Sequence, residues 1–345
     1  MTADDITLMQ QAPEFLRGVK TPRILMLLYH RVSDLPSDPQ LLSVRPAHFE
    51  QHLQVLQKKY RALKSSQLVE TDTSQKVSTN SIVVTFDDGY ADNLTHALPL
   101  LEKHEIPATV FVTTGIVQER KLFWWDELAR ITLGAHDVAK SLELQLDKFQ
   151  SWTFDQINDW SVQCSTDWNL LCEQDPTSRH KLYRDVSHFL RGASEGERAR
   201  VLQNLREWAS LIATVDSDCN ALTADELTKL GAADMIEIGS HTMHHPVLSA
   251  LSASAQEAEL RDSKLYLESL LGCEVQGFAY PYGTKSDYTS ETTTLVKKVG
   301  YKSACSNIAE AIWAGTDSFQ LPRLLVRDCD GSIFEEWLSQ WFGED

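Results

Sequence analysis

The sequence lacks the cysteine pattern of a disulfide-stabilised protein. Its six cysteines lie at widely spaced positions, with no C-x-x-C pair among them: 164, 172, 219, 273, 305 and 329. A disulfide framework would show shorter and more regular spacings. We therefore expect reduced, mostly buried thiols and assign them no function.

Basic charge and long apolar runs are also scarce. Lys and Arg number 32 against 49 Asp and Glu, so the formal net charge is −17. Such a surface repels phosphate backbones and anionic lipid headgroups, which disfavours nucleic acid and membrane surfaces as partners. The apolar run Ile24–Tyr29 is far shorter than the roughly 20 residues of a transmembrane helix. The first eighteen residues carry no basic segment followed by an apolar stretch, so we expect no secretory signal and a cytoplasmic protein.

Short apolar runs bounded by turn residues predict buried strands. They occur at Ile24–Tyr29, Ile82–Phe86, Thr109–Thr113, Met235–Gly239, Phe278–Tyr280, Lys302–Cys305 and Leu324–Arg327. Helical patterns lie between most of them, at Pro46–Lys59, Asp92–His104, Ala224–Leu230, Ala253–Leu271, Tyr288–Val299 and Ser332–Trp341. This alternation predicts parallel strands joined by crossover helices, hence an α/β sheet or barrel.

The alternation stops between residues 116 and 220, where Leu-, Trp- and charge-rich helical patterns occur without a convincing strand. We interpret these 105 residues as an inserted helical subdomain. Removing them leaves 240 residues, close to the roughly 250 of one α/β barrel. The predicted organisation is an N-terminal tail at 1–19, a barrel at 20–115 and 221–345, and the insertion at 116–220.

Two adjacent carboxylates follow the second predicted strand. Asp87 and Asp88 come directly after an apolar run, at the strand end where α/β barrels keep their active sites. Consecutive strand residues point to opposite faces, but a turn at the strand end lets both side chains reach one cavity. Two like charges in one pocket need a cation or a proton between them. An ordinary Asp-Gly turn is the alternative reading.

Three histidines lie within Ser240–Pro246, after another predicted strand. In a helical turn His241 and His245 project from the same side, so both imidazoles can meet one metal ion, with His244 as a spare candidate. One carboxylate and two imidazoles form a three-ligand set that leaves a position open for water, as catalytic zinc sites do. The other aspartate is then available as a base, which suits hydrolysis of an unreactive carbonyl such as an amide.

Two weaker motifs complete the candidate site. In Phe278–Gly283, a turn after a short strand can present the backbone N–H of Tyr282 to a developing oxyanion, although taken by itself the motif is better read as an aromatic-proline turn without a role. The strand Ile24–Tyr29 ends at His30, a residue suited to protonating a departing amine. A surface histidine is the ordinary alternative there.

The T-F-D-D-G, S-H-T-x-x-H-P and F-A-Y-P-Y-G elements together resemble the polysaccharide deacetylase family, carbohydrate esterase family four. The resemblance implies a distorted (β/α)7 barrel and divalent-metal-dependent removal of N-acetyl groups from amino sugars. Carried over by motif, it makes Asp87 the general base and Tyr282 the oxyanion donor. It makes Asp88, His241 and His245 the metal ligands, and zinc is our first choice because a His2Asp set suits it.

The sequence departs from the common family pattern in two places. Ala279 stands where the family usually has the arginine that orients the catalytic aspartate, and we predict that Arg323 takes this role. No histidine follows His245, so the usual Leu-x-x-His acid motif is absent. Members that resemble the poly-N-acetylglucosamine deacetylases take the acid from an early Tyr-His motif, which Tyr29 and His30 match. We therefore predict His30 as the general acid.

Six of the nine tryptophans fall in the insertion, and they include Trp124 and Trp125. Their rings could line a saccharide cleft, but we favour burial in the core of the insertion. The leading functional prediction is an N-deacetylase acting on an N-acetylated saccharide, polymeric, oligomeric or carrier-linked. The alternatives are an amidase or deformylase acting on a lipid-linked or small-molecule amide, and a saccharide-binding barrel without catalysis. The sequence does not indicate an oligomeric state.

Overall fold

The computed structural model describes residues 10–14, 23–68, 80–134, 137–154, 168–211 and 220–344. The chain divides into two compact units, which we describe separately. The barrel unit comprises Met1–Asp34, Leu42–Glu119 and Asn220–Asp345, and the insertion unit comprises Leu35–Leu41 and Arg120–Cys219. Most of the predicted N-terminal tail, 1–19, lies outside the described residues.

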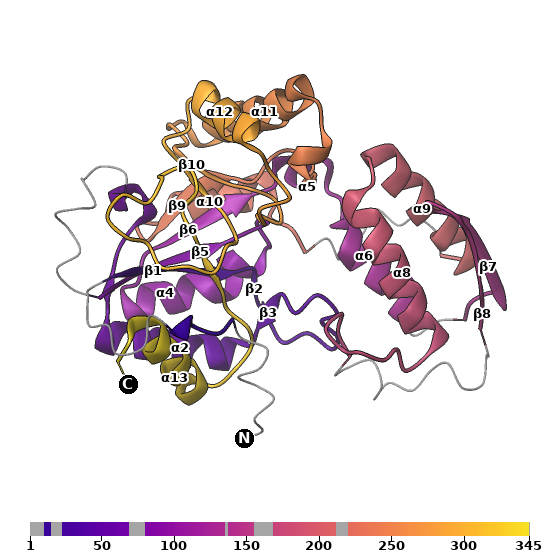
Figure 1. Ribbon diagram of the computed structural model, residues 1–345, viewed down its shortest axis with the longest axis horizontal. Helices are drawn as coiled ribbons and strands as arrows, with labels where there is room; N and C mark the ends of the chain where they lie inside the picture. The colour runs from indigo at the N-terminus through magenta and orange to yellow at the C-terminus, as the bar shows by residue number, and fades with distance from the viewer. Residues whose placement is uncertain are drawn as a thin grey trace. The chain divides into compact units, whose positions relative to one another are not determined.

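The barrel unit is built on parallel strands that run side by side (Figure 1). Their order is β11-β10-β9-β6-β5-β1-β12, and the short β4 (Arg61–Ala62) pairs with the start of β5. The strands of the main path are β1 (Ile24–Tyr29), β5 (Ser81–Phe86), β6 (Ala108–Val112), β9 (Ile236–Ser240), β10 (Gly277–Ala279), β11 (Ser303–Cys305) and β12 (Leu324–Leu325). Each corresponds to a predicted strand. A separate two-stranded ladder joins β2 (Arg31–Val32) to β3 (Ser43–Val44).

The two ends of this strand order meet. The N–H of Leu321, just before β12, donates to Ala304 O at 2.9 Å, and Ser306 N–H donates to Leu321 O at 2.8 Å. These bonds connect β11 to the chain that enters β12. The prediction of a distorted (β/α)7 barrel is therefore confirmed.

Apart from one helix at Thr114–Glu119, which the sequence did not predict, the helices of the barrel unit also follow the predicted pattern. Capping signals set their ends: Thr223 makes a capping box at α10, and Gly272 ends α11 in the left-handed region that glycine tolerates. No described helix is both long and apolar enough to cross a bilayer. The helices are α2 (Pro46–Lys59), α4 (Leu98–His104), α5 (Thr114–Glu119), α10 (Ala224–Gly231), α11 (Ala253–Leu271), α12 (Ser290–Val299) and α13 (Gly331–Phe342), with a π-helical turn, η3 (Asn93–Ala97), before α4 and the 3-10 turns η2 (Ser65–Leu68) and η4 (Leu248–Ala250).

Alternate strand residues separate the core into two layers, as the two-residue period of a strand requires. One cluster lies on the inner face and includes Met26, Val83, Phe111, Ala279 and Cys305. The other cluster joins the opposite strand faces to the helices. Every second residue of β1, β5 and β9 faces inward, and this alternation continues past the strand ends to residues 30, 87 and 241. The fold therefore directs these side chains toward the barrel interior.

The insertion unit contains helices α6 (Trp124–Leu133), α8 (Ser178–Gly192) and α9 (Glu195–Trp208). The insertion carries the predicted helices, but the expectation that it holds no strand is wrong, because β7 (Ser141–Gln145) and β8 (Phe149–Thr153) form an antiparallel hairpin. The side chains of β7 alternate between exposed and buried, so this strand is amphipathic rather than an apolar run.

Five of the six tryptophans predicted to lie in the insertion are described, and all five are buried: 124, 125, 152, 168 and 208. Trp125 stacks on Phe123 with ring centroids 4.7 Å apart and meets Trp124 edge-on at 5.3 Å. These contacts favour the interpretation of the tryptophans as core residues. Trp160 lies outside the described residues.

Among the described cysteines, Cys305 and Cys329 are buried, Cys172 is half-buried and Cys273 is exposed, so the expectation of mostly buried thiols holds only for the first two.

Candidate active site

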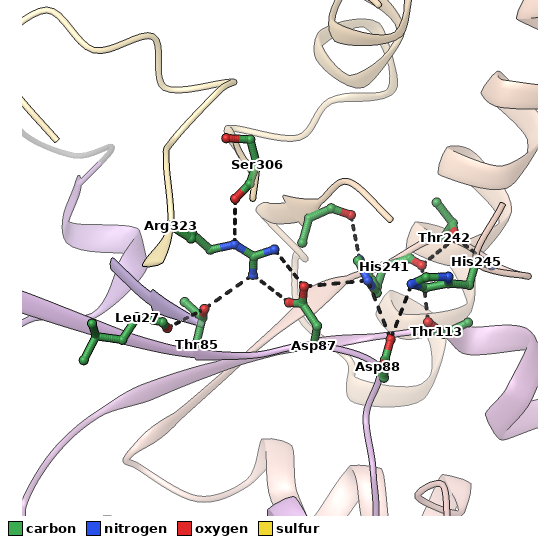
Figure 2. A network of polar contacts seen from close by, with 11 residues as sticks. Leu27, Thr85, Asp87, Asp88, Thr113, His241, Thr242, His245, Ser306 and Arg323 are labelled. Atoms are coloured by element: carbon green, nitrogen blue, oxygen red, sulfur yellow. Dashed lines mark hydrogen bonds and ion pairs between the residues drawn. The ribbon is translucent and has the colours of Figure 1, made fainter. Parts of the chain in front are cut away.

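The predicted site residues come together at the carboxyl end of the barrel strands. Figure 2 shows Asp87, Asp88, His241, His245 and Arg323 converging from segments that are far apart in the sequence. All five side chains are buried. The cluster therefore has the location expected for an active site in an α/β barrel.

Side chains alternate along β5, so the Asp88 side chain would point away from the barrel interior if the strand continued. The backbone conformation of Asp88 reverses this direction. Asp88 has φ of 77°, in the left-handed region, directly after the extended β5. The turn is held by a hydrogen bond from Thr113 N–H to Asp88 O at 3.1 Å. This conformation brings the Asp88 carboxylate to the same cluster as that of Asp87, as expected of a turn at the strand end.

The histidine segment does not form the predicted helical turn. Residues 241–245 form an irregular loop in which Thr242 and His245 have φ of 68° and 52°. The two imidazoles nevertheless meet, with ring centroids 4.8 Å apart. His244, the spare candidate, instead pairs with Glu259, with 2.7 Å between Nδ1 and Oε1.

Three donor atoms of this cluster suit a small divalent cation. Asp88 Oδ1 lies 3.7 Å from His241 Nε2 and 3.5 Å from His245 Nε2, and one ligand atom from each of the three residues lies within 4.8 Å of the others. A tetrahedral ion with bonds of about 2.0 to 2.2 Å separates two ligand atoms by about 3.3 to 3.6 Å. The spacing and the chemistry of the donors therefore fit a metal ion.

A backbone hydrogen bond fixes the tautomer of His241. Its Nδ1 lies 2.8 Å from the carbonyl oxygen of Ala279, which can only accept, so Nδ1 carries the proton and Nε2 presents a lone pair toward Asp88. Burial lowers the pKa of His241 more than Asp87 and this hydrogen bond raise it, which keeps the ring in the neutral form that binds metals. Ala279, where the family commonly has arginine, thus contributes through its backbone.

Arg323 holds the second carboxylate. Its Nη1 and Nη2 donate to Asp87 Oδ1 and Oδ2, each at 2.7 Å, in a bidentate pair (Figure 2). Nε donates to Ser306 O at 2.9 Å, and the guanidinium carbon lies 5.6 Å from the ring centroid of Phe111. This arrangement is the one we predicted for the arginine that orients Asp87.

The pair sets the charge of Asp87. Burial by itself raises the pKa of this carboxyl group, but Arg323 foremost, then His241 and His30, outweigh burial and hold it below the ordinary value. Burial likewise opposes the charge on Arg323, and Asp87 restores it, so the guanidinium pKa is raised. Asp87 is therefore an ionised carboxylate whose orientation is fixed.

The two remaining predicted residues lie in the same barrel unit. His30 directly follows β1, and its Nδ1 is buried without a hydrogen-bond partner among the described residues. Burial lowers the pKa of His30 to about 3, although the Asp87 carboxylate opposes the shift. Tyr282 has φ of 60°, and its ring meets the His245 ring edge-on with centroids 4.6 Å apart.

Sequence reasoning missed the residues that support this cluster. Thr85 accepts from Arg323 Nη1 at 3.4 Å and donates to Leu27 O at 2.8 Å, and Ser306 offers only its backbone oxygen. Thr85 lies two residues before Asp87 on the same strand face, which is the one signal that could have identified it. Ser306 gives no such signal, because any residue supplies a carbonyl.

Comparisons with known proteins relate this chain to one family. A family model described as polysaccharide deacetylase matches residues 74–160 and 204–304. YxkH of Bacillus subtilis (strain 168), named as a polysaccharide deacetylase, is 34% identical over 101 residues, which cover 28% of this chain and 34% of that protein. The match spans about a third of the length of this curated relative.

Two solved structures share the fold along most of the chain. The deacetylase PplD of Streptococcus pyogenes, in complex with acetate, has a TM-score of 0.58 and 17% identity over 93% of this chain and 99% of that one. IcaB from Ammonifex degensii has a TM-score of 0.56 and 17% identity over 94% and 98%. The family match agrees with the predicted class of enzyme, a hydrolase acting on amide C–N bonds. This chain belongs to the polysaccharide deacetylase family.

Proposed function

We propose that this protein is a metal-dependent N-deacetylase that hydrolyses the acetamide of an N-acetylated amino sugar. One observation carries the proposal: the buried donors of Asp88, His241 and His245 lie next to a carboxylate, Asp87, that Arg323 keeps ionised. A metal site without a base, or a base without a metal site, would support this chemistry less well.

Asp88, His241 and His245 would hold the metal ion, and a bound divalent ion would supply Lewis-acid polarisation of the acetamide carbonyl and a lowered pKa for water. Zinc is our first choice because two neutral imidazoles and one carboxylate are typical of its catalytic sites. Other first-row divalent metals fit the same donor set.

The protein's own residues then move the proton. Asp87, ionised and held by Arg323, takes the proton of the attacking water. His30 protonates the departing amine, and because burial keeps its imidazole uncharged, it must first receive a proton, for which the water proton taken by Asp87 is the source. The backbone N–H of Tyr282 would donate to the oxyanion of the tetrahedral intermediate. One proton of the water thus ends on the amine, and the acyl group leaves as acetic acid, which then ionises to acetate.

The same geometry bears on the alternative functions. The idea of a saccharide-binding barrel without catalysis arose from the missing arginine and the missing acid motif. The bidentate contact of Arg323 with Asp87 supports a catalytic barrel over this alternative, since another arginine can then orient the aspartate. The net charge of −17 fits a neutral acetamido sugar better than a strongly anionic glycan.

A substrate panel tests the proposal. The zinc-loaded protein is incubated with N-acetylglucosamine oligomers, their N-formyl analogues and a simple acetamide, and mass spectrometry follows the loss of acyl groups. Loss of acetyl groups from the oligomers is the expected result. A strict formyl preference would favour the deformylase alternative, and bound zinc without turnover of any amide would favour the saccharide-binding alternative.

The cytoplasmic location stays a prediction, which cell fractionation tests.

A further inference from the structure

The loop that carries the histidines has a strained backbone conformation. Thr242 and His245 both lie in the left-handed region, with φ of 68° and 52°. A residue with a side chain pays about 1 to 2 kcal/mol to adopt this conformation, and a β-branched residue such as Thr242 adopts it rarely. Such backbone persists only where the surroundings hold it. The question is which groups hold this loop.

A single carboxylate accepts from two of the loop's N–H groups. Glu259, on α11, accepts from Met243 N–H at 2.9 Å and from His244 N–H at 3.0 Å, both through Oε2. Its Oε1 lies 2.7 Å from His244 Nδ1. The Glu259 side chain is only 14% exposed, so these contacts are shielded from water. Hydrogen bonds to a shielded, charged acceptor are stronger than those between neutral groups.

The first two N–H groups of α5 donate to carbonyl groups of the same segment. Thr114 N–H donates to Thr242 O at 3.1 Å, and Gly115 N–H donates to Met243 O at 2.8 Å. The approach is so close that a Cβ on Gly115 would lie 2.5 Å from Met243 O. The peptide groups around Met243 are therefore held from both sides, by Glu259 and by α5.

We propose that Glu259 is a positioning residue of the metal site, which fixes the loop so that His241 and His245 both face Asp88. It does not touch the proposed ion, and it acts through the backbone between the two ligands. Without its carboxylate, the N–H groups of Met243 and His244 lose their acceptor, and the strained loop relaxes toward ordinary dihedral angles. The distances of 3.5 and 3.7 Å among the donors would then no longer be maintained.

The inference rests on the metal binding in the proposed function, but it does not depend on the deacetylase reaction. If the carboxylate merely stabilised the fold, its removal would lower the stability of the whole barrel and leave the metal affinity of the folded protein unchanged. Removal of a positioning residue instead lowers the metal affinity and the local protection of the loop. Supporting contacts around metal ligands typically change affinity by about 10- to 100-fold.

The test compares three variants of the full chain. Glu259→Ala removes every contact to the loop, whereas Glu259→Gln keeps an oxygen that can accept from both N–H groups. Glu257→Ala is the matched control, because it lies on the same helix and its carboxylate pairs with Lys298 at 2.8 Å, at the surface. Zinc affinity is measured by competition with a chromophoric chelator, and circular dichroism confirms folding.

We expect zinc dissociation constants about 10- to 100-fold higher for Glu259→Ala, a change of only a few-fold for Glu259→Gln, and none for Glu257→Ala. Hydrogen exchange of the metal-free proteins gives an independent measurement: peptides covering 241–245 should lose protection in Glu259→Ala alone. Wild-type zinc affinity and loop protection in folded Glu259→Ala would overturn the inference. If the wild type binds no zinc, the metal site of the proposed function fails, and unchanged loop protection in Glu259→Ala would separately overturn the role of Glu259.

Discussion

Replacing Arg323 with methionine should strongly destabilise the protein and change how its stability depends on pH. Arg323 and Asp87 are 0% and 3% exposed, and two hydrogen bonds of 2.7 Å join them. Methionine fills much of the space but leaves Asp87 buried without its partner. Breaking a buried pair in this way costs about 3 to 5 kcal/mol.

The pH dependence follows from the direction of the pKa shift. In the wild type the folded pKa of Asp87 lies below its unfolded value, so the pair contributes stability above the unfolded pKa and loses it as pH falls through the folded one. In Arg323→Met the largest opposition to burial is gone, so the pKa of Asp87 rises and the variant regains stability as acid protonates Asp87. The difference between the two proteins should be largest near neutral pH and should shrink on acidification.

Urea denaturation in the presence of a chelator measures this difference without interference from metal. Curves for the wild type, Arg323→Met, Asp87→Asn and the double variant give a double-mutant cycle. We expect a coupling energy of about 2 kcal/mol or more at neutral pH, within the range for buried contacts. Additive effects, or a loss below about 1 kcal/mol in Arg323→Met, would refute the assignment of Arg323 as the residue that keeps Asp87 ionised.

Three further changes should have distinct effects. Gly239→Ala should destabilise the barrel by about 1 to 3 kcal/mol in urea denaturation, since its Cβ would lie 2.3 Å from Phe111 Cδ1; wild-type stability would contradict this packing. His30→Ala should slow deacetylation by about 10²- to 10⁴-fold without changing zinc affinity, and unchanged turnover would remove His30 as the acid. Trp125→Ala should cost about 3 to 5 kcal/mol of stability and leave saccharide affinity unchanged, whereas weakened binding by the folded variant would instead place Trp125 in a saccharide cleft.

The barrel was predictable because its strands are buried on both faces. Runs such as Ile24–Tyr29 and Ile82–Phe86 are apolar at nearly every position, as parallel strands covered by helices must be. The hairpin of the insertion escaped prediction although Ser141–Gln145 alternates polar and apolar residues, because this signal is only five residues long and lies in a charged, helix-like context. The helix ends were predictable where capping residues such as Thr223 and Gly272 mark them.

The candidate site was predictable as a set of residues, whereas its internal geometry was not. A strand-end position and a resemblance identify Asp87, Asp88 and the histidines, but neither gives the left-handed φ of Thr242 or His245. Glu259 lies fourteen residues after His245 on a helix with many other charged residues, so no local pattern distinguishes it from a surface glutamate. Its role depends on tertiary contacts alone.

The most direct test of the account is the rate of acetate release from an N-acetylglucosamine oligomer, compared between zinc-loaded wild type and Asp87→Asn. The zinc content of both samples is measured at the same time. We predict that both proteins bind one zinc ion and that the variant releases acetate at least about 100-fold more slowly, because the ion stays and the base is lost. Equal rates at equal zinc content would contradict the central claim that Asp87 activates the attacking water.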